Sequence, residues 1–232
     1  MTNNRRPQFA ALFDADNISA KHAKPILDEL SNHGEIALRR VYGDWSDVRL
    51  KPWREVIAQH GMVAHQQTAH SKGKNATDIG MVIDAMDMLH SNRFDGFALV
   101  SSDSDFTALA NRLREAGQIV LGVGESKTPD SLRGTFTRFI QIENLSHQAG
   151  SVPKVDKALV KQAEDRLLNV IDAASDEDGW ISLSALGSQV TAKYPDFDTR
   201  TYGFAKLSGL VKATTRITYR KSGDVSQARR RP

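Results

Sequence analysis

The chain has 232 residues, of which 40% are hydrophobic and 25% charged, and it contains no cysteine. This composition excludes disulfides, thiolate zinc sites and cysteine nucleophiles, and no apolar run is long enough to span a bilayer. The N-terminal segment has only a short apolar run that ends at Asp14, which is not the pattern of a signal peptide. We therefore expect a cytoplasmic protein that does not act in a membrane, with one large domain or a medium-sized one followed by a small one.

Charge is distributed unevenly along the chain. The formal net charge is +3, but residues 1–150 carry 17 basic and 18 acidic side chains, whereas residues 151–232 carry 14 and 10. From Arg200 onward, nine basic residues stand against the single Asp224. A basic C-terminal part favours an anionic polymer as its partner, although charge runs are also common on solvated surfaces.

Strands alternate with helices over the first part of the chain. Apolar runs predict strands at 9–13, 36–42, 62–65, 97–100, 119–121 and 139–142. Apolar residues at helical spacing predict helices at 20–33, 47–60, 77–89 and 108–116, and a short one near residue 131. This alternation is typical of a three-layer α/β fold with a mainly parallel sheet.

The pattern changes after a stretch containing Gly, Ser and Pro, and the second part is mainly helical. Helices are predicted at 159–174, 181–193 and 201–210, followed by a small hairpin formed by 211–214 and 217–220. Three helices and a terminal hairpin are the outline of a winged helix.

These patterns predict the domain boundaries. We expect a first domain at 1–147, a linker at 148–156 and a winged-helix domain at 157–222. The remaining residues, 223–232, are expected to form a disordered basic tail.

Two of the predicted strands end in the same acidic pattern. Asp14 and Asp16 follow the first strand, and Asp103 and Asp105 follow the fourth. The carboxyl ends of parallel strands share one edge of a sheet, which is where open α/β sheets bind ligands. Asp78 lies in the first turn of the preceding helix and can face that edge. Carboxylates gathered in this way repel one another unless protons or a cation lie between them.

A divalent cation is the simplest way to hold these acids together. Oxygen ligands without cysteine favour Mg²⁺ or Mn²⁺, and such an ion supports phosphoryl transfer. The alternative for Asp14-Ala-Asp-Asn17 is a turn that caps the following helix. Two lysines in the polar loop before Asp78, Lys72 and Lys74, are placed to contact a phosphate backbone, or are ordinary surface charge.

Three stretches resemble the signatures of the NYN family, which belongs to the PIN-like nucleases and is also known through LabA-like proteins. They are FDADN at 13–17, TDIGMVIDAM at 77–86 and LVSSDSDF at 99–106. The resemblance covers residues 8–145. It implies a PIN-like α/β/α fold and a metal-dependent ribonuclease.

The resemblance also implies roles for individual residues. Asp14 corresponds to the acid of the first strand, Asp78 to the acid of the helix, and Asp103 and Asp105 to the acids of the fourth strand, which together would hold Mg²⁺ or Mn²⁺ and carry catalysis. Asn17 corresponds to the polar residue that follows the first strand, where it would contact substrate. PIN-like domains often dimerise, so the resemblance also allows a homodimer.

One position departs from the family pattern. Ser102 stands where a glycine is common before the Asp-Ser-Asp-Phe sequence. A hydroxyl there offers a hydrogen-bond donor to substrate, but a side chain changes how closely the backbone approaches a phosphate.

The C-terminal part resembles the LOTUS or OST-HTH domain. The similarity lies in GWISL at 179–183, YPDF at 194–197 and YGFAKLSGL at 202–210, and it covers about 157–222. It implies a winged helix that binds RNA, single-stranded or structured, or a partner protein. The predicted RNA-contacting residues are Lys206, Lys212, Arg216, Arg220 and Lys221.

Two other functions remain open on the sequence alone. Asp14-Ala-Asp16 after an apolar strand also suits the aspartyl-phosphate nucleophile of a haloacid-dehalogenase-type phosphatase, with Asp14 as the nucleophile. That family needs a cap domain and further Ser/Thr and Lys residues, which the sequence does not place convincingly. The third hypothesis is an RNA-binding adaptor whose acids have no catalytic role.

Overall fold

The computed structural model describes residues 5–66, 76–145 and 155–231. The chain divides into two compact units, Met1–Ser146 and His147–Pro232. Within the described ranges, no helix combines the length and the apolar character that crossing a membrane requires.

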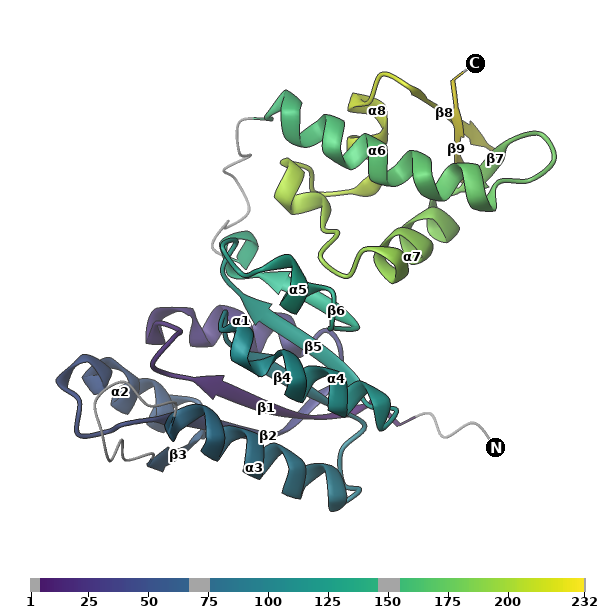
Figure 1. The fold of residues 1–232 in the computed structure, drawn as a ribbon. Coiled ribbons are helices and arrows are strands. Elements are labelled where there is room, and N and C mark those ends of the chain that lie inside the picture. The colour runs from purple at the N-terminus through teal and green to yellow at the C-terminus, as the bar shows by residue number, and fades with distance from the viewer. Residues whose placement is uncertain (1–4, 67–75, 146–154, 232) are drawn as a thin grey trace. The chain divides into compact units, whose positions relative to one another are not determined.

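The N-terminal unit is built on a six-stranded sheet in which all strands are parallel (Figure 1). The strands are β1 (Gln8–Asp14), β2 (Glu35–Gly43), β3 (Val63–Gln66), β4 (Gly96–Val100), β5 (Ile119–Gly124) and β6 (Arg138–Gln141). Their spatial order is β3-β2-β1-β4-β5-β6. The order reverses between β1 and β4, and ligands of open α/β sheets bind outside the carboxyl ends of strands at such a reversal.

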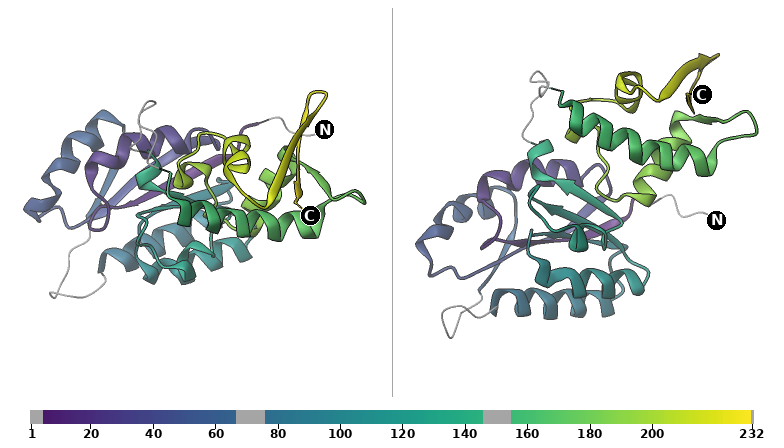
Figure 2. Two further views of the ribbon diagram at one scale, coloured as in Figure 1. Left: turned by 90° about the horizontal axis from the view of Figure 1, so that it is seen from above. Right: turned by 45° about the horizontal axis from the view of Figure 1, so that its top comes forward.

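Helices cover both faces of this sheet (Figure 2). On one face lie α1 (Ala23–Leu30) and α2 (Lys51–Gln59), and on the other lie α3 (Ala76–His90), α4 (Thr107–Glu115) and α5 (Asp130–Arg133). Short 3₁₀ turns connect these elements at η1 (Ala20–His22), η2 (Val48–Leu50), η3 (Ser104–Phe106) and η4 (Ile142–Leu145). The three-layer fold predicted from the sequence is confirmed.

The central strands carry apolar residues between their ends, and both faces of the sheet are buried there. In β1, Ala11 and Phe13 pack toward α1 and α2, whereas Ala10 and Leu12 pack toward α3 and α4. All five residues of β4 are buried as well. The first polar residues after these strands therefore emerge only at the carboxyl edge of the sheet.

The C-terminal unit contains three α-helices and a small antiparallel sheet within its described residues. The helices are α6 (Lys157–Ala174), α7 (Leu183–Lys193) and α8 (Leu207–Ala213), with a 3₁₀ turn η5 (Thr199–Tyr202) before α8. The strands β7 (Trp180–Ser182), β8 (Ile217–Ser222) and β9 (Val225–Arg230) are arranged in the order β7-β9-β8. The small winged-helix domain expected from the sequence is confirmed.

The end of this unit differs from the sequence-based expectation. Residues 223–231 are not a disordered tail, because β9 is the central strand of the sheet and pairs with both β7 and β8. The expected hairpin of 211–214 and 217–220 is also wrong, since α8 runs to Ala213. The hairpin is β8–β9, closed by the two residues Gly223 and Asp224. Gly223 has φ of 60°, the conformation that the first central position of a type II′ turn requires.

The predicted helix at 201–210 is divided in two. Gly203 adopts φ of 83° and ends η5, and α8 starts only at Leu207. A left-handed glycine at this position terminates a helix in the usual way.

Deleting residues 223–232 tests the placement of β9. We expect the thermal unfolding transition of the C-terminal unit to be lost, since β9 supplies the fully buried Ala228 and the hydrogen-bonding partner of both other strands. Differential scanning calorimetry measures this, with the transition of the N-terminal unit as the internal control. Retention of both transitions would contradict the assignment of β9 as the central strand.

Candidate metal centre

Asp14 organises the turn that follows β1. It is the last residue of the strand, and only 2% of its surface is exposed. Its Oδ1 accepts the backbone N–H groups of Asp16 at 3.1 Å and Asn17 at 3.2 Å. Its Oδ2 accepts the hydroxyl of Ser101 at 2.8 Å, from the residue that follows β4. Asp14 thus makes the turn that the sequence suggested and also faces the neighbouring strand end.

The surroundings of Asp14 favour its neutral form. Burial raises the pKa of this carboxyl from 3.8 to about 7, and the hydrogen bond from Ser101 opposes that rise. The carboxylate of Asp78 raises the pKa further, as does Asp16. Since an opposite charge favours the ionised form of a carboxyl, a nearby cation would lower the pKa of Asp14 again.

Three further acids converge beside this turn, and we call them the acidic group: Asp78, Asp103 and Asp105. Each offers one carboxylate oxygen, and these oxygens all lie within 4.8 Å of one another. Burial raises the pKa of Asp78, followed by the like charges of Asp103 and Asp105. The structure therefore brings together three of the four predicted ligands, and Asp14 lies close enough for Asp78 to influence its charge.

The acidic group is held by local backbone geometry. Asp103 caps η3, and its Oδ1 accepts the backbone N–H of Asp105 at 3.0 Å. Asp78 lies in the first turn of α3. Asp103 and Asp105 therefore come from one tight turn, whereas Asp78 is brought to it by the packing of a separate helix.

Ser101 links the two acidic turns. The sequence offered its hydroxyl, with those of Ser102 and Ser104, as a donor at this edge, but only Ser102 was selected as a site residue. The buried hydroxyl of Ser101 donates to Asp14 and also accepts the backbone N–H of Asp103 at 3.1 Å. The sequence signal was its place directly after β4, between a buried strand and an acid. Sequence alone could not show which of the adjacent serines faces Asp14.

Asn17 and Ser102 connect neighbouring strand ends. The Oδ1 of Asn17 accepts the backbone N–H of Ser102 at 3.2 Å, and the hydroxyl of Ser102 accepts the backbone N–H of Glu125 at 2.8 Å. Only 8% of Ser102 is exposed. These bonds tie together the ends of β1, β4 and β5, which is a positioning role. Direct contact of either residue with substrate stays a prediction.

Comparison with known families identifies both units. The NYN domain matches residues 8–143, which is more than half of the chain. The chain belongs to the NYN family. Residues 151–227 match the OST-HTH/LOTUS domain, so an NYN domain is followed by a LOTUS domain in the predicted order.

A solved structure supports the fold of the NYN domain. A protein of unknown function from Vibrio parahaemolyticus RIMD 2210633 superposes with a TM-score of 0.53 at 18% sequence identity. The match covers 61% of this chain and 96% of that one. At this identity the likeness shows the fold alone. No curated protein matches the chain.

A polar cluster fixes α3 of the NYN domain, and with it Asp78, against the sheet. Arg40 and Tyr42 of β2 both donate hydrogen bonds to the carboxylate of Asp84, about one and two-thirds turns after Asp78. Tyr42 is fully buried. The cluster thereby sets the rotation of α3 about its own axis and helps aim Asp78 at the other acids.

A hollow of about 280 Å³ opens next to Asp16 and Asn17. It continues across the β1–α1 turn to η2 and the start of α2, where Arg49 and Pro52 line it. Its lining combines these polar residues with apolar ones, among them the buried Trp53. Lys72 and Lys74, also predicted to contact substrate, lie outside the described residues.

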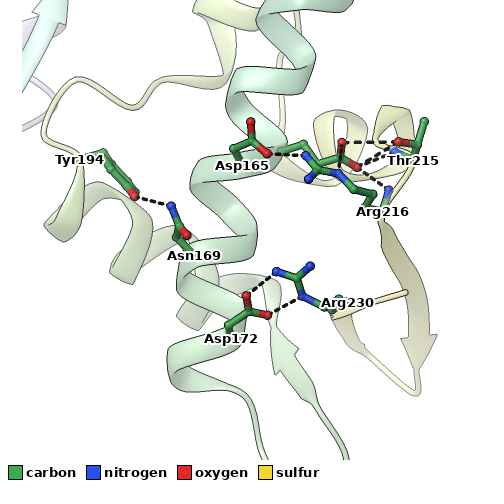
Figure 3. Close-up of polar contacts among 8 residues, drawn as sticks. Asp165, Asn169, Asp172, Tyr194, Thr215, Arg216 and Arg230 are labelled. Atoms are coloured by element: carbon green, nitrogen blue, oxygen red, sulfur yellow. Dashed lines mark hydrogen bonds and ion pairs between the residues drawn. The ribbon is translucent and has the colours of Figure 1, made fainter. Parts of the chain in front are cut away.

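The predicted RNA-contacting residues of the LOTUS domain are not equivalent. Arg216 binds Glu164 at 3.0 Å and Asp165 at 2.5 Å, so its charge is compensated within the domain (Figure 3). The other four are exposed, as Arg216 is, but they form no ion pair with an acid among the described residues. They are Lys206, Lys212, Arg220 and Lys221.

The buried carboxyl of Asp14 gives a testable pH dependence of stability. The pKa of Asp14 is about 7 in the folded protein and 3.8 in the unfolded chain. The protonated carboxyl therefore contributes its full stabilisation below pH 3.8, and this contribution is lost as the pH rises through 7. Asp14→Asn has no such proton. In EDTA, its stability relative to wild type should therefore improve between pH 4 and 8, by at most about 4 kcal/mol.

Denaturant unfolding at several pH values measures this difference. Asp87→Asn, an exposed position on α3, is the matched control and should track wild type at every pH. A constant difference between Asp14→Asn and wild type across this range would show that Asp14 is not held with a raised pKa.

Proposed function

We propose that the chain is a metal-dependent ribonuclease that hydrolyses phosphodiester bonds in RNA and that its LOTUS domain binds the RNA. The convergence of Asp78, Asp103 and Asp105 at the switch point of the sheet carries this proposal. NYN is a nuclease-type domain and OST-HTH/LOTUS domains bind RNA, which supports RNA as the substrate.

The acidic group fits a hard divalent cation such as Mg²⁺ or Mn²⁺. It offers only carboxylate oxygens, which these ions prefer. Three carboxylate oxygens within 4.8 Å of one another are near enough for one ion to draw them together as shared ligands. When bound, such an ion lowers the pKa of a water ligand and screens the charge that develops on phosphorus.

Within the proposal, the acids have different tasks. Asp78, Asp103 and Asp105 would hold the ion. Asp14 would join them in its ionised form and help to orient the attacking water, since positive charge in the group favours loss of its proton. Ser101 would act as a positioning residue, because its hydroxyl fixes Asp14 against the turn that carries Asp103.

The hollow next to Asp16 and Asn17 is proposed to receive a nucleotide adjacent to the scissile phosphate. It begins at Asp16 and Asn17 and ends at the exposed side chain of Arg49. Substrate contacts by Asn17, Ser102, Lys72 and Lys74 are part of this proposal. So are a cytoplasmic location and, by resemblance to other PIN-like proteins, a homodimer.

The burial of Asp14 argues against the phosphatase hypothesis. An aspartyl nucleophile needs a carboxylate oxygen that reaches the phosphorus atom, but both oxygens of Asp14 accept hydrogen bonds and only 2% of the residue is exposed.

The adaptor hypothesis differs from the nuclease hypothesis in one expectation, which is RNA binding without cleavage.

Asp103→Asn tests the nuclease. With Mn²⁺ and a labelled single-stranded RNA, wild type should cleave, and the variant should lose at least about 100-fold in rate, equivalent to about 2.7 kcal/mol of transition-state stabilisation. RNA affinity in EDTA should not fall in the variant, because the change removes negative charge. Asp87→Asn, at an exposed position on α3, is the control and should cleave like wild type.

The outcomes separate the hypotheses. Binding without cleavage in either metal would favour the adaptor. Hydrolysis of p-nitrophenyl phosphate that Asp14→Asn abolishes, in the absence of RNA cleavage, would favour the phosphatase. Equal cleavage by wild type and Asp103→Asn would refute the assignment of the acidic group.

A further inference from the structure

The outer face of the LOTUS sheet carries a tryptophan. In the pairing of the strands, Ile181 of β7 and Tyr219 of β8 lie opposite Ala228 of β9, and all three belong to the core. Trp180 precedes Ile181, and side chains alternate along a strand, so Trp180 points to the opposite face. Nevertheless only 7% of Trp180 is exposed.

Two arginines cover this ring. The guanidinium of Arg220, from β8, lies 3.7 Å from the centre of the Trp180 ring, and that of Arg229, from β9, lies 4.7 Å from it. The Nε of Arg220 also donates to Gln227 at 2.8 Å, which fixes the orientation of the guanidinium. We call Trp180, Arg220 and Arg229 the stacked cluster.

The charges of the stacked cluster are not compensated by acids. Elsewhere in the domain, Arg166, Arg216 and Arg230 each form an ion pair with a carboxylate, and Figure 3 shows the last two reaching α6. Among the described residues, neither Arg220 nor Arg229 has such a partner. The Nε of Arg229 is buried and has no hydrogen-bond acceptor there. The Trp180 ring therefore holds these two arginines in place of a carboxylate, so their positive charge can attract an anionic ligand.

The geometry points to a ligand with flat rings and negative charge. Arg220 is an exposed residue whose guanidinium lies against the Trp180 ring. A base that approaches from solvent can therefore stack on this guanidinium. Unpaired nucleic-acid bases stack on guanidinium planes and aromatic rings, whereas a duplex buries the faces of its bases.

We propose that the stacked cluster is a platform on which LOTUS binds the bases of single-stranded RNA. The choice of RNA rests on the proposed function. The site itself is independent of the acidic group, because it needs no metal and lies in the other domain.

Charge around the sheet suggests the path of the strand. Lys221 is exposed next to Arg220 on the edge strand β8. On the β7 side, the turn before Trp180 carries Glu177 and Asp178, which repel phosphates. The phosphate backbone is therefore expected to run along β8, with the bases directed over Arg220.

Arg220→Lys separates stacking from charge. The full chain in EDTA is titrated into a labelled oligoadenylate of about 12 nucleotides, and affinity is measured by fluorescence anisotropy at several salt concentrations. Lysine keeps the charge but lacks the plane, so the affinity should fall about tenfold. The slope of log affinity against log salt should stay as in wild type, whereas Arg220→Ala should reduce its magnitude by about 0.7.

Two controls keep this test decisive. Lys161→Ala, exposed on α6, should bind like wild type, and the melting temperature of Arg220→Lys shows whether the domain is still folded. An abasic oligomer of the same length should bind wild type and Arg220→Lys equally. The proposal fails if folded Arg220→Lys binds oligoadenylate like wild type, which would leave a protein partner as the occupant of this face, or if the abasic oligomer shows the same tenfold loss.

The result is distinguishable from failure of the nuclease proposal. Binding is measured in EDTA and does not depend on catalysis. Cleavage of short RNA by the full chain is measured separately with Mn²⁺. Loss of affinity without any cleavage would support the platform and refute only the nuclease.

Discussion

Repulsion among carboxylates is the constraint on which the N-terminal unit depends. The fold places Asp78, Asp103 and Asp105 within one small volume and leaves the buried Asp14 beside them. Burial raises the pKa values of Asp14 and Asp78, and the like charges of neighbouring acids raise them further. Close carboxylates lower the free energy of unfolding at neutral pH, because they repel one another. A cation bound between them would raise it again.

Hydrogen bonds elsewhere in the NYN domain hold these acids in place. Hydrogen bonds from Ser101 join the turns after β1 and β4, and the bond between Asn17 and Ser102 repeats the link. On the other side, Arg40 and Tyr42 fix the helix that carries Asp78. Apart from the bond between Ser101 and Asp103, these contacts join elements that are distant in sequence, so the tertiary structure positions the acidic turns and α3 relative to one another.

The sequence predicted those parts of the structure that local patterns determine. The apolar runs that end in acids located β1 and β4, and the alternation of strands with helices indicated the parallel α/β class, whereas the order of the strands came from the structure. The sequence did not single out Ser101, because only the packing of β4 against β1 decides which serine meets Asp14. It also missed β9, whose residues Val225–Arg230 are mostly polar or basic and are a strand because two partners pair with them. The Ser-Gly-Asp-Val turn was the available signal for this hairpin.

Charge alone also did not distinguish two arginines of the LOTUS domain. Arg216 is neutralised by acids of α6, whereas the ring of Trp180 holds Arg220.

The central claim is that the carboxylates at the switch point hold one divalent cation. Anomalous diffraction from crystals soaked in Mn²⁺ tests it most directly, because the manganese signal locates the ion independently of any activity. The account predicts a peak about 2.0–2.6 Å from oxygens of Asp78, Asp103 and Asp105. A peak bound elsewhere, or an empty acidic group at saturating Mn²⁺, would contradict it.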